Sequence, residues 1–347
     1  MARFLLWFGS VWAALGFLHA GEAVGAFGSA RVLPGAMMFA EVANVKDGPF
    51  SGIGDLGDKV KEKITDLLPT GVAEPIDVML SKFGLENRDY RWLAFTLGEI
   101  RTDATNELPA VSCAVSFSHE IDTVVENIRS GFKTNRLNRV FLFETEVGTN
   151  RVWLVNGFPQ PKGKKNLHPC LTSLGGELVI FASSIDMLSR QIALYGAEGE
   201  EDLVLKGPPV SRTRPFSMRT REIASLRKVG GLLGESFLAD AERVWPNISA
   251  VVENLKTMNL TLAARGRGGV IVRCLLVLKD AKVAESFLAD LEKRRNLVGL
   301  ALGIRSLWDA RSRAISAILN ALRLSCRGTI VIGTLETTVD TLHQLER

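Results

Sequence analysis

Histidine is scarce in this chain, and the motifs of the common metal sites and hydrolases are missing. The four histidines stand far apart in the sequence, at His19, His119, His168 and His343. No helix can therefore present a histidine pair to a metal ion. No Cys-x-x-Cys pair, Gly-x-Ser-x-Gly elbow or P-loop occurs. The sequence therefore lacks the motifs of thioredoxin-like redox proteins, serine hydrolases and P-loop phosphate-binding proteins. The sequence predicts no catalytic, cofactor-binding or metal-ligating residues and no cofactor.

Long apolar runs are also missing, except at the N-terminus. There Arg3 precedes an apolar stretch at 4–18, and small residues follow it. This order is typical of a secretory signal peptide, which we assign to residues 1–26, with cleavage after Ala20, Ala23 or Ala26. An uncleaved anchor would need about 20 apolar residues, more than this stretch offers. We therefore expect a periplasmic or secreted protein that does not span the membrane once the signal is removed.

The chain carries little excess of either charge. Its 42 Lys and Arg residues against 38 Asp and Glu residues leave a net charge of +4. That balance does not favour nucleic acid as a partner. Hydrophobic residues make up 46% of the sequence, which is the composition of a globular protein with a sizeable core.

Two stretches of the chain resemble each other in their pattern of strands and helices. Strand-like alternation recurs in the same order at 36–45, 92–100, 110–117 and 177–182, and again at 216–226, 258–265, 270–278 and 329–333. Helical spacing follows the third strand of each series, at 119–132 and 280–294. We interpret residues 34–198 as a first repeat, 199–211 as a linker and 212–347 as a second repeat.

Each repeat has the predicted order β-α-β-β-α-β-α. The hairpin inside it implies an antiparallel sheet, with helices packed on one face. The predicted fold class is therefore α+β, with two related repeats. In this pattern the chain resembles uncharacterised exported proteins of planctomycete-like bacteria, which also carry two α+β halves. The resemblance implies no activity and no site residues.

The four cysteines occupy matching places in the two repeats. Cys113 and Cys274 lie in equivalent strands, and Cys170 and Cys326 precede the last strand of each repeat. In an oxidising compartment this placement favours disulfides within each repeat, Cys113–Cys170 and Cys274–Cys326. The alternative is four buried free thiols acting as small apolar side chains.

A cluster of arginines opens the second repeat. Arg212, Arg214, Arg219 and Arg221 are candidates for contact with an anionic envelope component, the alternative being a solvated strand. Together these features favour a non-enzymatic binding or interaction protein of the cell envelope, whose partner is an envelope protein or ligand. A hydrolase with a site assembled by the fold, or a structural or assembly factor of the envelope, are the competing hypotheses.

Overall fold

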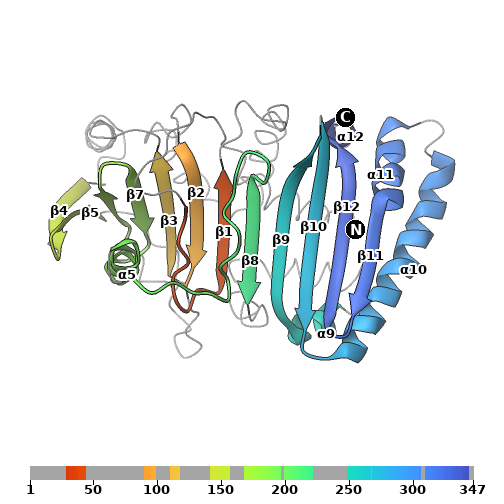
Figure 1. Ribbon diagram of the computed structural model, residues 1–347, viewed down its shortest axis with the longest axis horizontal. Coiled ribbons are helices and arrows are strands. Elements are labelled where there is room, and N and C mark those ends of the chain that lie inside the picture. The colour runs from red at the N-terminus through yellow and green to blue at the C-terminus, as the bar shows by residue number, and fades with distance from the viewer. Residues whose placement is uncertain are drawn as a thin grey trace. The chain divides into compact units, whose positions relative to one another are not determined.

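The computed structural model describes residues 29–43, 90–98, 110–117, 141–156, 168–196, 199–221, 248–266, 268–305 and 309–343. These residues form twelve strands and five helices (Figure 1). They divide into two compact units, a first unit that ends at Val210 and a second that begins at Ser211. The predicted signal peptide and the predicted helix at 119–132 lie outside the described residues, so both stay predictions.

The first unit is a seven-stranded antiparallel sheet with one described helix. In space the strands follow the order β1-β2-β3-β7-β6-β5-β4. Their bounds are β1 (Met38–Ala43), β2 (Tyr90–Leu97), β3 (Val111–Phe117), β4 (Phe141–Val147), β5 (Asn150–Asn156), β6 (Cys170–Leu174) and β7 (Leu178–Ala182). The helix, α5 (Ile185–Tyr195), contacts β7, β6 and β3.

The second unit is a five-stranded antiparallel sheet with four described helices. Its strands follow the order β8-β9-β10-β12-β11. Their bounds are β8 (Phe216–Arg221), β9 (Leu255–Arg265), β10 (Gly269–Leu278), β11 (Leu322–Arg327) and β12 (Ile330–Thr338). The helices are α9 (Ile248–Asn254), α10 (Ala281–Arg305), α11 (Ala310–Ala321) and α12 (Val339–His343).

The two sheets share an order of strands. Without the β4–β5 hairpin, the first order reads β1-β2-β3-β7-β6, and it matches β8-β9-β10-β12-β11 strand for strand. The strand with Cys113 and the strand with Cys274 are both third in their sheets. The internal repeat stays a prediction, and this shared order supports it.

The predicted fold class is wrong. The described part of the chain is mostly antiparallel sheet, with twelve strands and five helices, and its elements do not follow the order β-α-β-β-α-β-α. In the first unit, β4 to β7 run as a meander of successive hairpins, and α5 is the one helix that the described residues contain. The sequence pattern missed β4 and β6 because β6 has five residues and β4 lies at the edge of the sheet, where apolar alternation is weak.

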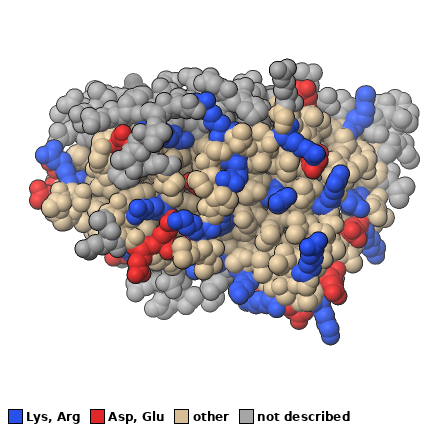
Figure 2. All heavy atoms as spheres, in the orientation of Figure 1, with Lys and Arg blue, Asp and Glu red and all other residues tan. Residues whose placement is uncertain are grey.

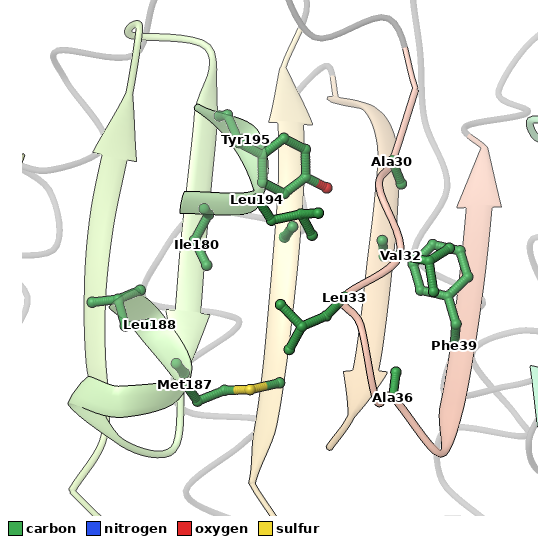
Figure 3. Close-up of a cluster of buried hydrophobic side chains, with 14 of the residues drawn as sticks. Ala30, Val32, Leu33, Ala36, Phe39, Ile180, Met187, Leu188, Leu194 and Tyr195 are labelled. Carbon is green, nitrogen blue, oxygen red and sulfur yellow. The ribbon is translucent and has the colours of Figure 1, made fainter. Parts of the chain in front are cut away.

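Helix α5 and an N-terminal segment close the core of the first unit. Ser184 caps the helix, because its side chain accepts a hydrogen bond from the Met187 backbone N–H. The buried residues of α5 fall at helical spacing and face the sheet. The segment at 29–36, here called the strap, lies across the same face and adds Val32 and Leu33 to the core. Figure 3 shows Leu33 directed toward the α5 side chains.

Tyr195, at the end of α5, ties the strap to the helix. Its hydroxyl accepts a hydrogen bond from the Arg31 backbone N–H at 3.1 Å, and its ring stacks on Trp92 with centroids 6.3 Å apart. The Arg31 guanidinium donates to the Leu194 carbonyl oxygen at 2.8 Å. Burial is the main cause that raises the pKa of the Tyr195 hydroxyl, and the Glu41 carboxylate adds to the rise. The ring is therefore a neutral structural anchor.

The segment predicted as a linker packs against the strap. The Asp202 backbone N–H donates to the Val32 carbonyl oxygen at 2.9 Å, and a Glu201 carboxylate oxygen accepts from the Val32 N–H at 3.2 Å. Leu205 is 1% exposed and belongs to the core of the first unit. Residues 199–210 thus group with the first unit, and the assignment of the two repeats around them stays a prediction.

Among the described helices none has both the length and the hydropathy needed to cross a membrane. The longest of them, α10, carries charged residues along its length, including Lys282, Glu285, Lys293 and Arg294.

Candidate anion-binding face

The four predicted arginines do not form one exposed patch. Arg212 and Arg214 lie in a turn closed by the isolated bridge between Ser211 and Arg214, before β8 begins. Arg219 and Arg221 point to the same face of β8, since they are two residues apart. Arg219 is only 5% exposed, so it has little surface to offer an external partner.

The strand register shows which residues share the face of Arg219 and Arg221. One row across the sheet runs from Ser217 through Thr261, Arg273 and Thr334 to Arg323. The parallel row that starts at Arg221 ends at Arg327, because directly paired residues in antiparallel strands point to the same side. We call this side of the second sheet the open face.

The open face is rich in arginine and poor in carboxylates. Its arginines are Arg219, Arg221, Arg265, Arg273, Arg323 and Arg327, of which the last four are exposed. On the described strands its acidic residue is Glu336, which forms an ion pair with Arg265. Figure 2 shows more Lys and Arg than Asp and Glu side chains over the area that β9 to β12 occupy in Figure 1.

The opposite face of the same sheet is apolar and covered by helices. Leu260, Leu262 and Val270 are at most 4% exposed on that side. Helix α10 contacts β10, β11 and β12, and α11 contacts β11 and β12. Their buried side chains, which include Phe287 and Ile318, complete this core. The described helices thus pack on the apolar face, and none of them covers the exposed arginines of β9, β10 and β11 on the other face.

The spacing of the exposed guanidinium groups follows from sheet geometry. Arg273 and Arg323 flank β12, so their Cα atoms lie about 10 Å apart. Arg323 and Arg327 are four residues apart on β11, about 13 Å along the strand. Half-buried apolar side chains, among them Leu275 and Ile332, lie between them. This surface can meet several anionic groups at once and also make apolar contacts.

Sequence reasoning missed Arg265, Arg273, Arg323 and Arg327 as a group. The signal for the last two was present, because they alternate with apolar residues along LRLSCR. No pattern within one segment could join them to Arg273, which lies about 50 residues earlier; only the pairing through β12 brings them together.

The cysteines are free thiols in the structure. Cys113 pairs in register with Phe181, and Phe181 pairs with Leu171. Cys113 therefore shares a face with Leu171, while the neighbouring Cys170 points to the other face. The two residues also lie two strands apart, at about 10 Å between Cα atoms, whereas a bridge needs less than about 7 Å. The Cys113–Cys170 disulfide stays a prediction that this geometry does not favour.

The second predicted disulfide also stays a prediction, and the distance between its cysteines does not favour it. Cys274 pairs with Gly333 and Cys326 with Val331, so the two cysteines share a face but flank β12 at different levels. Their Cα atoms are again about 10 Å or more apart. Equivalent positions along the chain therefore did not place either pair within bonding reach.

We expect non-reducing peptide mapping to recover all four cysteines as free thiols. The protein would be denatured in an alkylating agent without reductant, digested and analysed by mass spectrometry. The reason is the sheet geometry, which places the Cα atoms of each predicted pair beyond bridging distance. A disulfide-linked peptide joining Cys113 to Cys170 would show that β3 and β6 are not separated by β7.

Burial also keeps these thiols protonated. Desolvation raises the pKa of the Cys113, Cys170 and Cys274 thiols to about 12. Desolvation likewise raises the pKa of Cys326, and the Glu285 carboxylate adds to the rise. Because the thiolate is the nucleophile, the four cysteines are inert at neutral pH.

The described residues contain no group of three or more His, Cys, Asp or Glu side chains placed to hold a metal ion. No family model, curated protein or solved structure matches this chain. The resemblance to exported planctomycete-like proteins therefore stays a prediction.

Proposed function

We propose that this chain is a non-enzymatic binding protein of the bacterial cell envelope that uses the open face to contact anionic phospholipid headgroups. The observation that carries the proposal is the set of four exposed arginines, Arg265, Arg273, Arg323 and Arg327, on one side of one sheet. The envelope location rests on the signal-peptide pattern of residues 1–26.

Arginine suits this role by its chemistry. The planar guanidinium matches phosphate oxygens in a bidentate geometry and is more weakly hydrated than an ammonium group. A basic residue near an anionic membrane surface contributes about 1 kcal/mol to binding. Within the described part of the chain, Arg273, Arg323 and Arg327 form no ion pair with a carboxylate, so their charge is available to headgroups.

The apolar side chains on the open face favour a lipid surface over a linear anionic polymer. Leu275 and Ile332 lie between the arginines and are half-buried. The boundary between headgroups and acyl chains accepts apolar side chains next to charged ones. A polymer in water would leave such side chains without a favourable contact. We therefore propose an anionic bilayer surface as the partner.

Co-sedimentation with lipid vesicles tests the proposal. We expect binding to vesicles of phosphatidylcholine with phosphatidylglycerol, little binding to phosphatidylcholine alone, and weaker binding as salt rises. The triple variant Arg273→Glu, Arg323→Glu and Arg327→Glu should bind the anionic vesicles at least about a hundredfold more weakly, since three favourable charges become repulsive.

A matched variant of the same unit controls for total charge. Lys282, Lys293 and Arg313 are exposed on the helices of the covered face, and changing all three to Glu alters the net charge equally. This control should retain most of the binding. Equal loss in both variants would mean that only net charge matters. Binding to polyphosphate but not to vesicles, abolished by the arginine variant, would show that the face is right and the lipid partner wrong.

A further inference from the structure

Strand β4 is the last strand of the first sheet. It pairs with β5 in an unbroken register from Phe141 with Asn156 to Val147 with Asn150. A two-residue turn, Gly148 and Thr149, joins the strands, and Gly148 adopts a φ of 61° that favours glycine. No other described strand or helix pairs with β4.

The turn fixes which backbone groups of β4 face outward. In a two-residue hairpin the residues that flank the turn, here Val147 and Asn150, exchange hydrogen bonds, and the pattern then alternates. Thr145 and Phe143 therefore also face β5. The backbone N–H and C=O groups of Glu144 and Glu146 point toward the outer edge, as those of residue 142 do.

The side chains leave this edge exposed. Phe143 is 49% exposed on one face, and Glu144 and Glu146 are exposed on the other. Natural proteins protect edge strands with charged side chains, above all lysine, and with proline or a bulge. Strand β4 has no lysine and no proline in FLFETEV, and its register with β5 has no shift.

The edge strand of the second sheet differs in this respect. Strand β11 pairs with β12, and α10 lies against it. The Arg295 guanidinium of α10 donates a hydrogen bond to the Leu322 carbonyl oxygen at 3.0 Å. A helix thus partly covers the β11 edge, whereas β4 has no such cover among the described residues.

We propose that β4 is a docking edge that binds an extended basic segment of a partner protein as an added antiparallel strand. Main-chain hydrogen bonds to the outward groups would provide affinity, as in other cases of strand addition. Glu146 and Glu144, the latter also ion-paired with Arg151 of β5, favour lysine or arginine at alternate positions of that segment, and Phe143 favours an apolar residue on the other face.

The same charges disfavour a second copy of the chain. Antiparallel self-pairing about Thr145 sets Glu144 directly opposite Glu146 of the other copy. Pairing about Phe143 brings the two Glu144 residues to diagonal positions. Like charges at these positions destabilise strand pairs, so a basic partner fits and a homodimer does not. The proposed docking edge on β4 does not involve the arginines of the open face.

The probe is a synthetic peptide of alternating valine and lysine, with an alternating valine and glutamate peptide as its control. We expect the basic peptide, and not the acidic one, to bind at β4 of the full chain. Hydrogen exchange provides the specific signature: binding should slow exchange at least about tenfold at the amides of Glu144 and Glu146, which face outward. The amides of Phe143 and Thr145, already bonded to β5, should change little.

A matched pair of variants tests the role of the backbone. Glu146→Pro removes an outward N–H at a position where proline is tolerated in an edge strand. Glu146→Thr removes the same charge but keeps that N–H. The proline variant should bind the basic peptide at least about tenfold more weakly than the threonine variant, because a hydrogen bond is lost. Retained protection at Phe143 and Thr145 would show that the β4–β5 hairpin is intact.

If the proline variant disrupts the hairpin, a peptide N-methylated at alternate amides replaces it, and this probe should fail to bind the unchanged chain. Equal binding by the two variants, or by the N-methylated peptide, would overturn the proposal. So would binding without protection of Glu144 and Glu146, equal protection of these amides by the acidic peptide, or self-association through β4. Protection at β4 separates binding at this edge from binding of the acidic peptide to the arginines of the open face.

Discussion

Raising the pH above 9 is expected to destabilise this protein steeply. The Cys170 thiol is 2% exposed, and its pKa rises from 9.0 in the unfolded chain to about 12 in the fold. Between these values the unfolded chain loses the proton and the folded chain keeps it. The unfolded state then binds fewer protons, so the free energy of unfolding falls as pH rises, by about 1.4 kcal/mol per pH unit for this one group.

Cys113 and Cys274 add to this loss, since burial raises the pKa of each thiol to about 12. They are half-buried, so each should contribute less than Cys170. All of this stability is present below pH 9. Because domains are stable by only about 5–15 kcal/mol, we expect a large shift in the urea midpoint between pH 8 and pH 11, well before the folded thiols ionise.

Comparison with Cys170→Ala isolates the contribution of one thiol. The variant should be less stable at pH 8, because it loses buried atoms and the contact of Sγ with the Ala182 carbonyl oxygen at 3.7 Å. Above pH 9 the difference between the two proteins should narrow by about 1.4 kcal/mol per pH unit. Urea unfolding followed by circular dichroism from pH 8 to pH 11 measures this. A constant difference over that range would contradict the raised pKa of Cys170.

The sequence predicted strands better than it predicted their assembly. Runs of apolar and β-branched side chains located β3, β10 and β12 in the sequence. The same signal is short in β6, which starts directly after Pro169 and has five residues. Without β4 and β6 the meander could not be recognised, and the α+β interpretation followed from the missing strands.

Buried side chains outside helices and strands were even harder to predict from the sequence. Val32 and Leu33 stand in ARVLPGA, where glycine and proline indicate a loop. The fold nevertheless packs both side chains under α5. The face of the sheet to which the Cys170 side chain points could not be predicted from the sequence either, because it depends on the register of β6 against β7. Contacts between distant segments are set by register and packing, which no single segment encodes.

Truncation of Leu33 should have a large effect on stability. Leu33 is 2% exposed and lies in the cluster that includes Met187, Leu188 and Leu194 (Figure 3). Leu33→Ala removes buried methyl groups and leaves a cavity between the strap and the helix. We expect the free energy of unfolding of the first unit to fall by about 3 kcal/mol. Urea unfolding at pH 7 measures the change.

The strap also holds the segment after α5, which gives this variant a second, local readout. Asp202 and Glu201 both hydrogen-bond to the backbone of Val32, so a loosened strap should expose residues 199–206 to proteases. We therefore expect faster cleavage there in Leu33→Ala than in the unchanged protein. Leu203→Ala is the matched control, because Leu203 is 77% exposed and its loss should change stability by less than about 0.5 kcal/mol. Equal effects of the two substitutions would mean that the strap is not packed against α5 and that the core of the first unit closes without it.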